Sequence, residues 1–192
     1  MDRRAQGIKP RDFAGGRMAA IEPLDAEGLA REMEPLSRIL MACVHAGASI
    51  GFILPFGKDE ALAFWRDAIG PALARGDKLM LIARNESGHI VGTGQLHIGN
   101  LPNQAHRAEV SKLMVDPTAR RQGIARQLMQ ALEALAKERR RTLLTLDTRS
   151  DDAAEPLYLS LGYKAAGRIP GYAQNAIDPT VFDSTTYMYK EL

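Results

Sequence analysis

Apolar side chains recur every three or four residues early in the chain and at every second residue later on. The first helical pattern begins after Asp25 and runs to about Ala46, and Pro35 is expected to kink or divide that helix. Its apolar positions are Leu29, Met33, Leu36, Leu40 and Val44. A second helix is expected from Asp59 to Gly76. Its apolar face consists of Leu62, Trp65, Ile69 and Leu73.

Strand patterns dominate the rest of the chain. Strands are expected at Arg17–Ile21, Lys78–Arg84, His89–Ile98, Arg107–Val115, Thr142–Thr148, Tyr163–Ile169 and Val181–Lys190. A long amphipathic helix is expected from about Gly123 to Arg140, and a short one follows Asp152, with Glu155 in capping-box position. The strand–helix–strand unit around the long helix requires a parallel strand pair. The fold class is therefore α/β, a mixed and mostly antiparallel sheet with helices on both faces.

The domain organisation follows from length and from two apolar segments. Residues 1–16 carry no apolar stretch after Arg3 and Arg4, so we expect a polar extension rather than a secretory signal. Residues 17–192 are expected to form one domain. The 19 residues from Ile39 to Gly57 contain no Asp, Glu, Lys or Arg and are long enough to span a bilayer. Because two glycines and Pro55 interrupt them, we expect a buried helix end and an apolar loop, not a membrane span.

Composition narrows the function classes. Cys43 is the one cysteine, which excludes an internal disulfide and a thiolate zinc site and fits the cytoplasm. We expect it to be a core thiol. The four histidines show no ligand spacing, so no metal is predicted. With 25 basic and 23 acidic side chains, the net charge of +2 argues against a nucleic-acid-binding protein.

A phosphate-binding pattern follows the strand that ends at Val115. After Asp116-Pro117, a helix begins at Gly123 among arginines, where free backbone N–H groups and the helix dipole favour a diphosphate. From Thr118 to Arg141 there are seven cationic and two anionic side chains. Two other phosphate motifs do not apply, since no Walker-type lysine loop is present and Gly92-Thr93-Gly94 lacks the third glycine of a dinucleotide fingerprint.

The motif Arg120-x-x-Gly123-x-Ala125 resembles the acyl-CoA signature of the GNAT N-acetyltransferase superfamily. Leu157-Tyr158-Leu159-Ser160-Leu161-Gly162-Tyr163 resembles the second signature of that family. The resemblance covers about residues 25–192. Within the family, the sequence is most similar to the tabtoxin-resistance group of acetyltransferases. The segments that carry this closer resemblance are His45–Phe52, Arg107–Val115, Leu143–Thr148 and Pro170-Gly171-Tyr172.

The resemblance implies the GNAT fold, acetyl-CoA as the acetyl donor and a set of site residues. Backbone groups of Leu113, Met114 and Val115 would pair with the pantetheine arm. The cofactor-binding positions around the pyrophosphate would be Arg120, Arg121, Gln122, Gly123, Ile124, Ala125 and Arg126. The catalytic residues would be Glu109, Asp147 and Tyr158.

The chemistry of these residues fits acyl transfer to an amine. The attacking amine must be neutral, so a carboxylate has to accept a proton. Alternation places Glu109 on the same strand face as Ser111 and Leu113, and Asp147 lies near the carboxyl end of its strand. Tyr158 would donate to the departing thiolate. Structural roles stay open: a strand-end cap or salt bridge for Asp147, a cross-strand ion pair for Glu109 and a half-buried aromatic for Tyr158.

Two classes of function remain. The first is an acetyl-CoA-dependent N-acetyltransferase for a small amino-acid-like amine, including a toxin or antibiotic, with peptides and protein lysines as broader acceptors. Residues 45–52 and the two N-terminal helices would form one wall of the acceptor site. The second is a non-catalytic acyl-CoA-binding module, against which the retained Glu109, Asp147 and Tyr158 argue. A homodimer through the C-terminal strands would be consistent with the family.

Overall fold

The computed structural model describes residues 19–99 and 101–192. The predicted extension of residues 1–16, and the first two residues of the first predicted strand, lie outside the described residues. The strands are β1 (Ala20–Pro23), β2 (Lys78–Arg84), β3 (Ile90–Ile98), β4 (Arg107–Val115), β5 (Leu143–Arg149), β6 (Lys164–Gln174) and β7 (Phe182–Glu191). The α-helices are α1 (Ala26–His45), α2 (Lys58–Ala63), α3 (Gly70–Arg75), α4 (Ile124–Glu138) and α5 (Ala154–Ser160).

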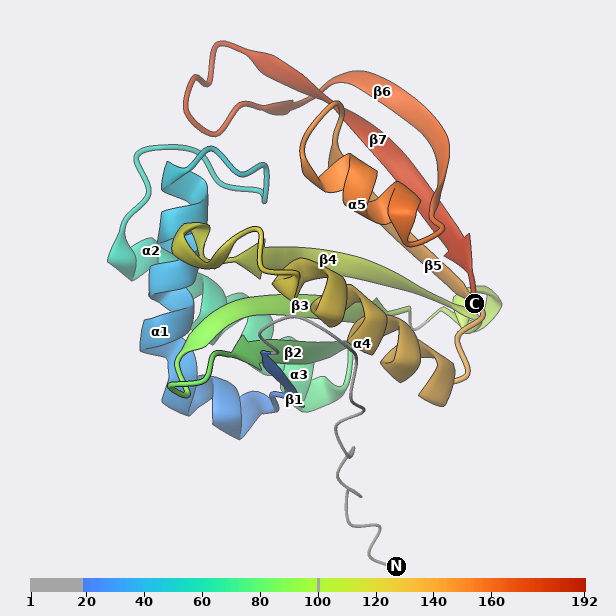
Figure 1. Cartoon of the computed structure of the whole chain (residues 1–192), viewed down its shortest axis with the longest axis horizontal. Coiled ribbons are helices and arrows are strands. Elements are labelled where there is room, and N and C mark those ends of the chain that lie inside the picture. The colour runs from blue at the N-terminus through green and yellow to red at the C-terminus, as the bar shows by residue number, and fades with distance from the viewer. Residues whose placement is uncertain (1–18, 100) are drawn as a thin grey trace, which may run out of the picture.

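The seven strands form one sheet in the order β1-β2-β3-β4-β5-β7-β6 (Figure 1). Strands β4 and β5, which flank α4 in the sequence, pair in parallel, and the other neighbouring strands pair antiparallel. The predicted mixed, mostly antiparallel sheet is therefore confirmed.

Two clusters of buried side chains hold helices against opposite faces of the sheet. On one face, α1 and the helices after it pack Leu36, Ile39 and Trp65 against Met80 and Ile82 of β2. On the other face, α4 and α5 pack against the alternate strand residues. That second cluster includes Leu128, Leu132 and Tyr158 from the helices, and Leu81, Leu96, Leu144 and Leu146 from the strands.

Several predicted boundaries need correction in the helices. Helix α1 is continuous through Pro35, because the proline removes one backbone donor while the buried residues on both sides keep the helix against the sheet. The second predicted helix begins at Lys58 and is interrupted by a π-helical turn at Phe64–Ile69. That turn shifts the face, so the fully buried positions are Ala61, Trp65, Ile69 and Ala72, with Leu62 and Leu73 only partly buried.

The cap of α5 also differs from the prediction. Ala153 occupies the N-cap position and no side chain caps the helix. The Glu155 carboxylate instead accepts from the Asp151 N–H at 2.9 Å, and Asp152 forms an ion pair with Arg149 at 2.9 Å. Strand β6 continues past the predicted end at Ile169 to Gln174, with an irregular register between Ile169 and Ala173.

A β-bulge in β4 changes which side chains share a face. Ser111 lies opposite Gln95 and Met114 lies opposite Thr93, so Lys112 and Leu113 together oppose one residue of β3. Lys112 has a left-handed backbone conformation, with φ of 50°. The prediction that Leu113 shares a face with Glu109 is wrong, because Leu113 packs with the α4 cluster while Ala108 and Val110, the neighbours of Glu109, also point that way.

Strands β4 and β5 separate soon after they meet. Their parallel pairing covers three positions and ends at Glu109 opposite Thr145. Beyond that pair, residues 110–115 of β4 do not pair with residues 146–149 of β5. Figure 1 shows the two strands diverging, with α5, β6 and β7 on one side of the opening and β3 on the other.

Candidate active site

The start of α4 presents a run of unpaired backbone donors. No hydrogen bond to a described residue is made by the amide N–H groups of residues 121–126, and no side chain caps the helix. Gly123 occupies the N-cap with φ of 80°, a conformation that glycine adopts without strain. Arg121 is also left-handed, with φ of 65°, and both residues are exposed. This geometry suits an anionic ligand such as a diphosphate.

Buried Asp116 fixes the turn before α4. Its carboxylate accepts from the Thr118 N–H at 3.0 Å, from the Thr118 hydroxyl at 2.7 Å and from the guanidinium of Arg38 on α1. Burial raises the pKa of Asp116, but these hydrogen bonds and the Arg38 charge outweigh it, so its pKa lies below the usual value. Arg38 therefore ties α1 to the turn that precedes the predicted diphosphate site.

The arginines of the predicted diphosphate site are not equivalent. The Arg120 Nε lies 3.4 Å from the Val115 carbonyl, and Arg126 donates to the Ser160 hydroxyl at 2.8 Å. Arg121 makes no hydrogen bond or ion pair with a described residue. Among the three, Arg121 is thus the most available to a ligand, while Arg126 also connects α4 to α5.

The opening between β4 and β5 leads directly to this helix start. Met114 and Val115 pair with β3 on one edge, and the edge of residues 113–115 that faces β5 is free of strand pairing. An extended amide chain such as pantetheine could bond to that edge as an additional strand would. The free β4 edge and the free amides of α4 therefore fit the two ends of an acyl-CoA donor.

Glu109 and Asp147 lie on the sheet face opposite the α4 cluster. Both are exposed, and the adjacent strand residues Ala108, Val110 and Leu146 belong to that cluster. The Asp147 carboxylate accepts from the Thr185 hydroxyl of β7 at 3.1 Å. Glu109 forms no ion pair or hydrogen bond with a described residue, although it stands across from His97 and Thr145. The ion-pair alternatives for these two carboxylates are therefore absent from the described residues.

Tyr158 lies on the other side of the sheet. It is 7% exposed in the α4 cluster, and its ring packs edge-on against Tyr163 with centroids 6.0 Å apart. Burial, followed by the charges of Asp147 and Asp152, raises the pKa of Tyr158 to about 12. The phenol thus keeps its proton at neutral pH, as a donor to a thiolate requires. The three predicted catalytic residues therefore share no single face, because Glu109 and Asp147 lie on one side of the sheet and Tyr158 on the other.

Two lysines and two tyrosines near the carboxylates were not predicted from the sequence. The Lys112 Nζ donates to the Ile50 carbonyl at 2.7 Å, and the Lys78 Nζ lies 3.5 Å from the Ser111 hydroxyl. Tyr187 stands opposite Asp147 in the β5–β7 register, and its hydroxyl lies 2.7 Å from that of Tyr172. Tyr172 belongs to a segment that carried the family resemblance, but the left-handed bulge at Lys112 leaves no sequence signal of its own.

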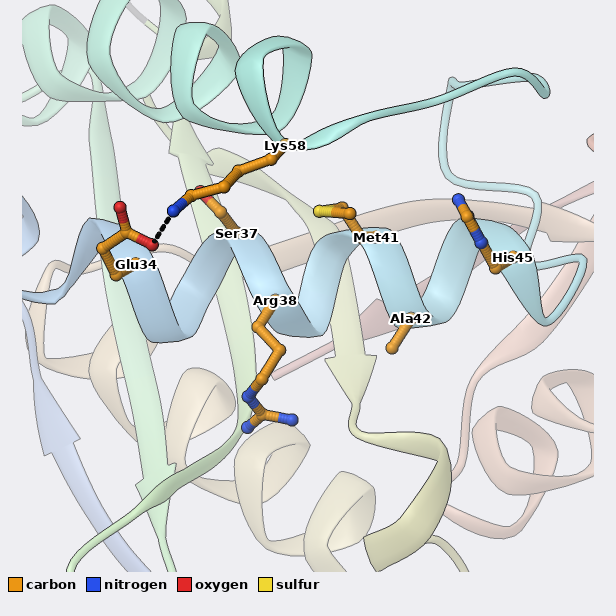
Figure 2. Close-up of a pocket in the computed structure, with 7 residues that line it drawn as sticks. All are labelled: Glu34, Ser37, Arg38, Met41, Ala42, His45 and Lys58. Atoms are coloured by element: carbon orange, nitrogen blue, oxygen red, sulfur yellow. Dashed lines mark ion pairs between the residues drawn. The ribbon is translucent and has the colours of Figure 1, made fainter.

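A separate pocket of about 400 Å³ lies along α1 (Figure 2). It contains none of the predicted catalytic or cofactor-binding residues, but it lies on the two N-terminal helices that were predicted to form one wall of the acceptor site. Its lining residues are Glu34, Ser37, Arg38, Met41, Ala42, His45 and Lys58. Glu34 and Lys58 form an ion pair of 2.8 Å across it, and Arg38 points away from them toward the turn at Asp116. The pocket is thus adjacent to the anchor of the diphosphate site and distinct from the carboxylates.

The described residues show neither a metal-binding cluster nor a membrane-spanning helix. No group of three or more His, Cys, Asp or Glu side chains in residues 19–99 and 101–192 is arranged to hold a metal ion. None of the helices in those ranges has the length and apolar character needed to cross a bilayer. Residues 39–57, the apolar run of the sequence, instead form the end of α1 and the loop to α2.

The sequence matches the model of the Acetyltransferase (GNAT) family over residues 38–163. It is 35% identical over 85 residues to a UPF0039 protein of Schizosaccharomyces pombe, covering 44% of this chain and 53% of that protein. It is 30% identical over 115 residues to an N-acetyltransferase encoded in the hisH-hisA intergenic region of Azospirillum brasilense, covering 59% of this chain and 66% of that protein. The matches thus span between half and two thirds of these curated relatives.

Solved structures with the same fold include two that hold acetyl-CoA. The yncA structure from Salmonella typhimurium, with its cofactor acetyl-CoA, has a TM-score of 0.71 and 19% identity, covering 91% of this chain and 94% of that one. A GNAT superfamily phosphinothricin acetyltransferase from Sinorhizobium meliloti, also with acetyl-CoA, has a TM-score of 0.72 and 17% identity, covering 91% and 89%. At these identities the likeness establishes the fold alone.

Proposed function

We propose that this chain, which belongs to the acetyltransferase (GNAT) family, transfers an acetyl group from acetyl-CoA to the amine of a small molecule. One observation carries the proposal. The opening between β4 and β5 joins the free amides at the start of α4 to the exposed carboxylates of Glu109 and Asp147. A site with a diphosphate cradle at one end and proton acceptors at the other has the parts that acyl transfer needs.

In this proposal the donor is held by backbone groups more than by side chains. The amides of residues 121–126 bind the pyrophosphate, with Arg120 and Arg121 adding positive charge, and Arg126 joins them after release from Ser160. The free edge of Leu113, Met114 and Val115 bonds to the pantetheine arm. Gln122, Gly123, Ile124 and Ala125 complete the helix start. When bound, acetyl-CoA supplies an acetyl thioester.

The side chains then handle two protons. Asp147, with its orientation set by Thr185, removes a proton from the acceptor ammonium or from an intervening water, and Glu109 is the alternative base. Tyr158 lies across the strand opening and donates a hydrogen bond or a proton to the sulfur as charge develops on it. A neutral phenol at neutral pH supports this role.

We propose an amino-acid-like acceptor, a class that includes toxins and antibiotics. The loop between α1 and α2 supports a compact site. The Leu54 N–H donates to the Ala176 carbonyl of the β6–β7 connection at 2.8 Å, and Arg149 donates to the Gly47 carbonyl at 3.0 Å. These bonds hold the α1–α2 loop against the β6–β7 connection and against the end of β5, the strand that carries Asp147. Because the sequence has one cysteine and therefore no internal disulfide, it supports a cytoplasmic location.

A homodimer is part of the same proposal. Edge strand β6 is exposed along nearly its whole length, including the large side chains of Ile169 and Tyr172, and Phe182 of the neighbouring β7 is exposed as well. A second copy covering that strand would bury this surface. Light scattering of the purified chain tests this proposal, and a monomer at micromolar concentration would contradict it.

The function is tested by acetyl-CoA-dependent release of free thiol against a panel of amines. The panel contains amino acids, aminoglycosides, polyamines and lysine peptides. We expect turnover with small amino-acid-like amines and a rise in melting temperature with acetyl-CoA. Turnover of peptides alone would move the acceptor class to proteins. A thermal shift with no turnover of any amine would favour a non-catalytic acyl-CoA-binding module.

A further inference from the structure

Two lysine ammonium groups share the sheet face of Glu109 and Asp147. Lys78 of β2 pairs with His97 of β3, which in turn pairs with Glu109 of β4, so the three form one row across the sheet. Lys112 lies at the β4 bulge, next to Ser111, and Ser111 is the residue that Lys78 approaches. The two carboxylates therefore lie beside two cations that come from different strands.

Neither lysine forms an ion pair with a carboxylate of the described residues. Among the described residues, Lys112 forms one hydrogen bond, to the Ile50 carbonyl, and its Nζ lies 5.7 and 5.8 Å from the ring centroids of Phe52 and Phe64. Within residues 19–99 and 101–192, the one hydrogen-bond contact of Lys78 is the long 3.5 Å contact with Ser111. An ammonium group carries three N–H donors, so most of the donors of both groups are unused.

Partial burial makes this arrangement unfavourable without an anion. Burial lowers the pKa of Lys78, and burial together with the charge of Lys78 lowers the pKa of Lys112. Two ammonium groups that repel each other in a partly desolvated place are stabilised by a negative charge between them. Glu109 acts on both lysines and Asp147 on Lys112 from a distance, and both carboxylates raise the lysine pKa, but neither forms an ion pair with Lys78 or Lys112 among the described residues.

The backbone at Lys112 adds a second sign of function. A lysine with φ of 50° inside a strand is strained, because left-handed conformations disfavour side chains with a Cβ atom. The bulge moves this residue out of the strand alternation, and the ammonium then reaches the loop of residues 47–57. Such strain is typical of places where a side chain has to be aimed at a ligand.

We infer that Lys78 and Lys112 form an anion subsite that binds the carboxylate of the acceptor, while Glu109 and Asp147 receive its amine. The inference rests on the proposed function and narrows its substrate class to zwitterionic amines. Two cations beside two anions match a molecule that carries both charges, and they repel one end of a polyamine. The residues of this subsite are specificity-determining, since they contact the part of the acceptor that does not react.

The test compares acceptors that differ only at the carboxylate. The purified full chain is supplied with acetyl-CoA and with L-amino acids, the matching amino-acid amides and the matching decarboxylated amines. We expect kcat/KM for the acids to exceed that for the amides by about tenfold to a hundredfold, the range of one charge-assisted hydrogen bond. Lys78→Met and Lys112→Met should each reduce this ratio, and Lys112→Arg should restore part of it.

Lys164→Met is the matched control. Lys164 lies on β6 over the Tyr189 ring, at the far end of the sheet, and its loss should leave the ratio unchanged. Because Lys112→Met also removes the bond to Ile50, each variant is checked for its melting temperature and for stabilisation by acetyl-CoA. Lys78→Met, which removes only a long contact, keeps the test valid if Lys112→Met fails to fold.

The outcomes separate this inference from the proposed function. Equal turnover of acids and amides, or a preference that survives in both lysine variants, would overturn the subsite and leave the acetyltransferase in place. If no amine is acetylated, calorimetry in the presence of CoA measures whether the same amino acids bind to the subsite. Binding that weakens in Lys78→Met supports the subsite without the reaction, and no binding of any acid overturns it.

Discussion

The Thr185 hydroxyl of β7 lies 3.1 Å from the Asp147 carboxylate and 2.9 Å from the Thr148 carbonyl. Thr185 is 3% exposed, so one buried hydroxyl from the neighbouring strand restricts the rotation of an exposed acid. Glu109 has no comparable partner among the described residues. An oriented carboxylate is better suited than a freely rotating one to accept a proton at a fixed position.

Asp147→Asn should therefore lower the acetylation rate more than Glu109→Gln does. The amide keeps the shape and the contact with Thr185 but cannot accept the proton, and a loss of about 10²-fold or more is expected. Thr185→Val, the companion variant, should cost less, because the base remains and only its orientation is loosened. The measurement is kcat/KM for the acceptor at neutral pH. A near-normal Asp147→Asn together with a severely impaired Glu109→Gln would exchange their roles.

The sequence predicted the elements around the site well because their signals are local. Lys78–Arg84 and Arg107–Val115 are strands with the predicted bounds, and the turn from Asp116 to Gly123 leads into α4 as expected. Proline and glycine punctuation and strict periodicity are read from neighbouring residues. The α1 cap was equally local, with Asp25 accepting from the Gly28 N–H at 2.7 Å.

The missed features depend on residues far apart in the chain. The bulge at Lys112 exists only in relation to Gln95 and Thr93 of β3, and it moved Leu113 to the other face from Glu109. Alternation within one strand cannot show a residue that the partner strand leaves unpaired. The Arg38–Asp116 contact joins positions 78 residues apart and has no sequence pattern at all.

Gly123→Asp tests the diphosphate site. Aspartate places bulk and negative charge where the free amides begin, so stabilisation by acetyl-CoA should disappear in a thermal melt. A left-handed conformation costs a side-chain residue roughly 1–2 kcal/mol in itself, which calls for a matched control. Gly88 has φ of 79° in the β2–β3 turn, far along the chain from α4, and an added Cβ there meets nothing within 4 Å.

Gly88→Asp should be destabilised by the same backbone strain, but acetyl-CoA should still raise its melting temperature. Loss of the shift in both variants would mean that strain alone explains it. An undiminished shift in Gly123→Asp would show that the start of α4 does not bind the donor.

Asp116→Asn tests the anchor of the turn and has a defined pH dependence. The folded-state pKa of Asp116 lies below its ordinary value, so its charge stabilises the fold above about pH 4. That contribution is lost as the pH falls through the folded-state pKa. We expect Asp116→Asn to lose about 1–3 kcal/mol in the free energy of unfolding at neutral pH. The difference from wild type should be smaller at an acidic pH below about 4 than at neutral pH.

Urea unfolding at the two pH values measures this difference. Glu86→Gln is the control, because Glu86 is an exposed carboxylate of the β2–β3 turn without a hydrogen bond to a described residue. Its substitution should change stability little at either pH. A pH-independent loss in Asp116→Asn would assign the effect to packing rather than to the carboxylate charge.

Tyr158→Phe separates binding from chemistry. The ring stays in the α4 cluster against Tyr163, so the fold and the acetyl-CoA thermal shift should survive. The lost hydroxyl has no hydrogen bond to a described residue, so its removal leaves no buried partner unsatisfied. Because its pKa is raised to about 12, the phenol is protonated across the neutral range, and the pH profile below about pH 10 should keep its shape.

The expected loss in Tyr158→Phe lies in the chemical step. A hydrogen bond to the developing thiolate matters mainly in the transition state, so kcat and kcat/KM should fall together with little change in KM for acetyl-CoA. A charge-assisted hydrogen bond of about 1.5–3 kcal/mol corresponds to a loss of roughly tenfold to a hundredfold. A thiolate leaves fairly well unaided, so a slowed enzyme is expected rather than an inactive one. Since slow product release can mask chemistry, the decisive measurement is the single-turnover rate, and a wild-type rate there would remove Tyr158 from the mechanism.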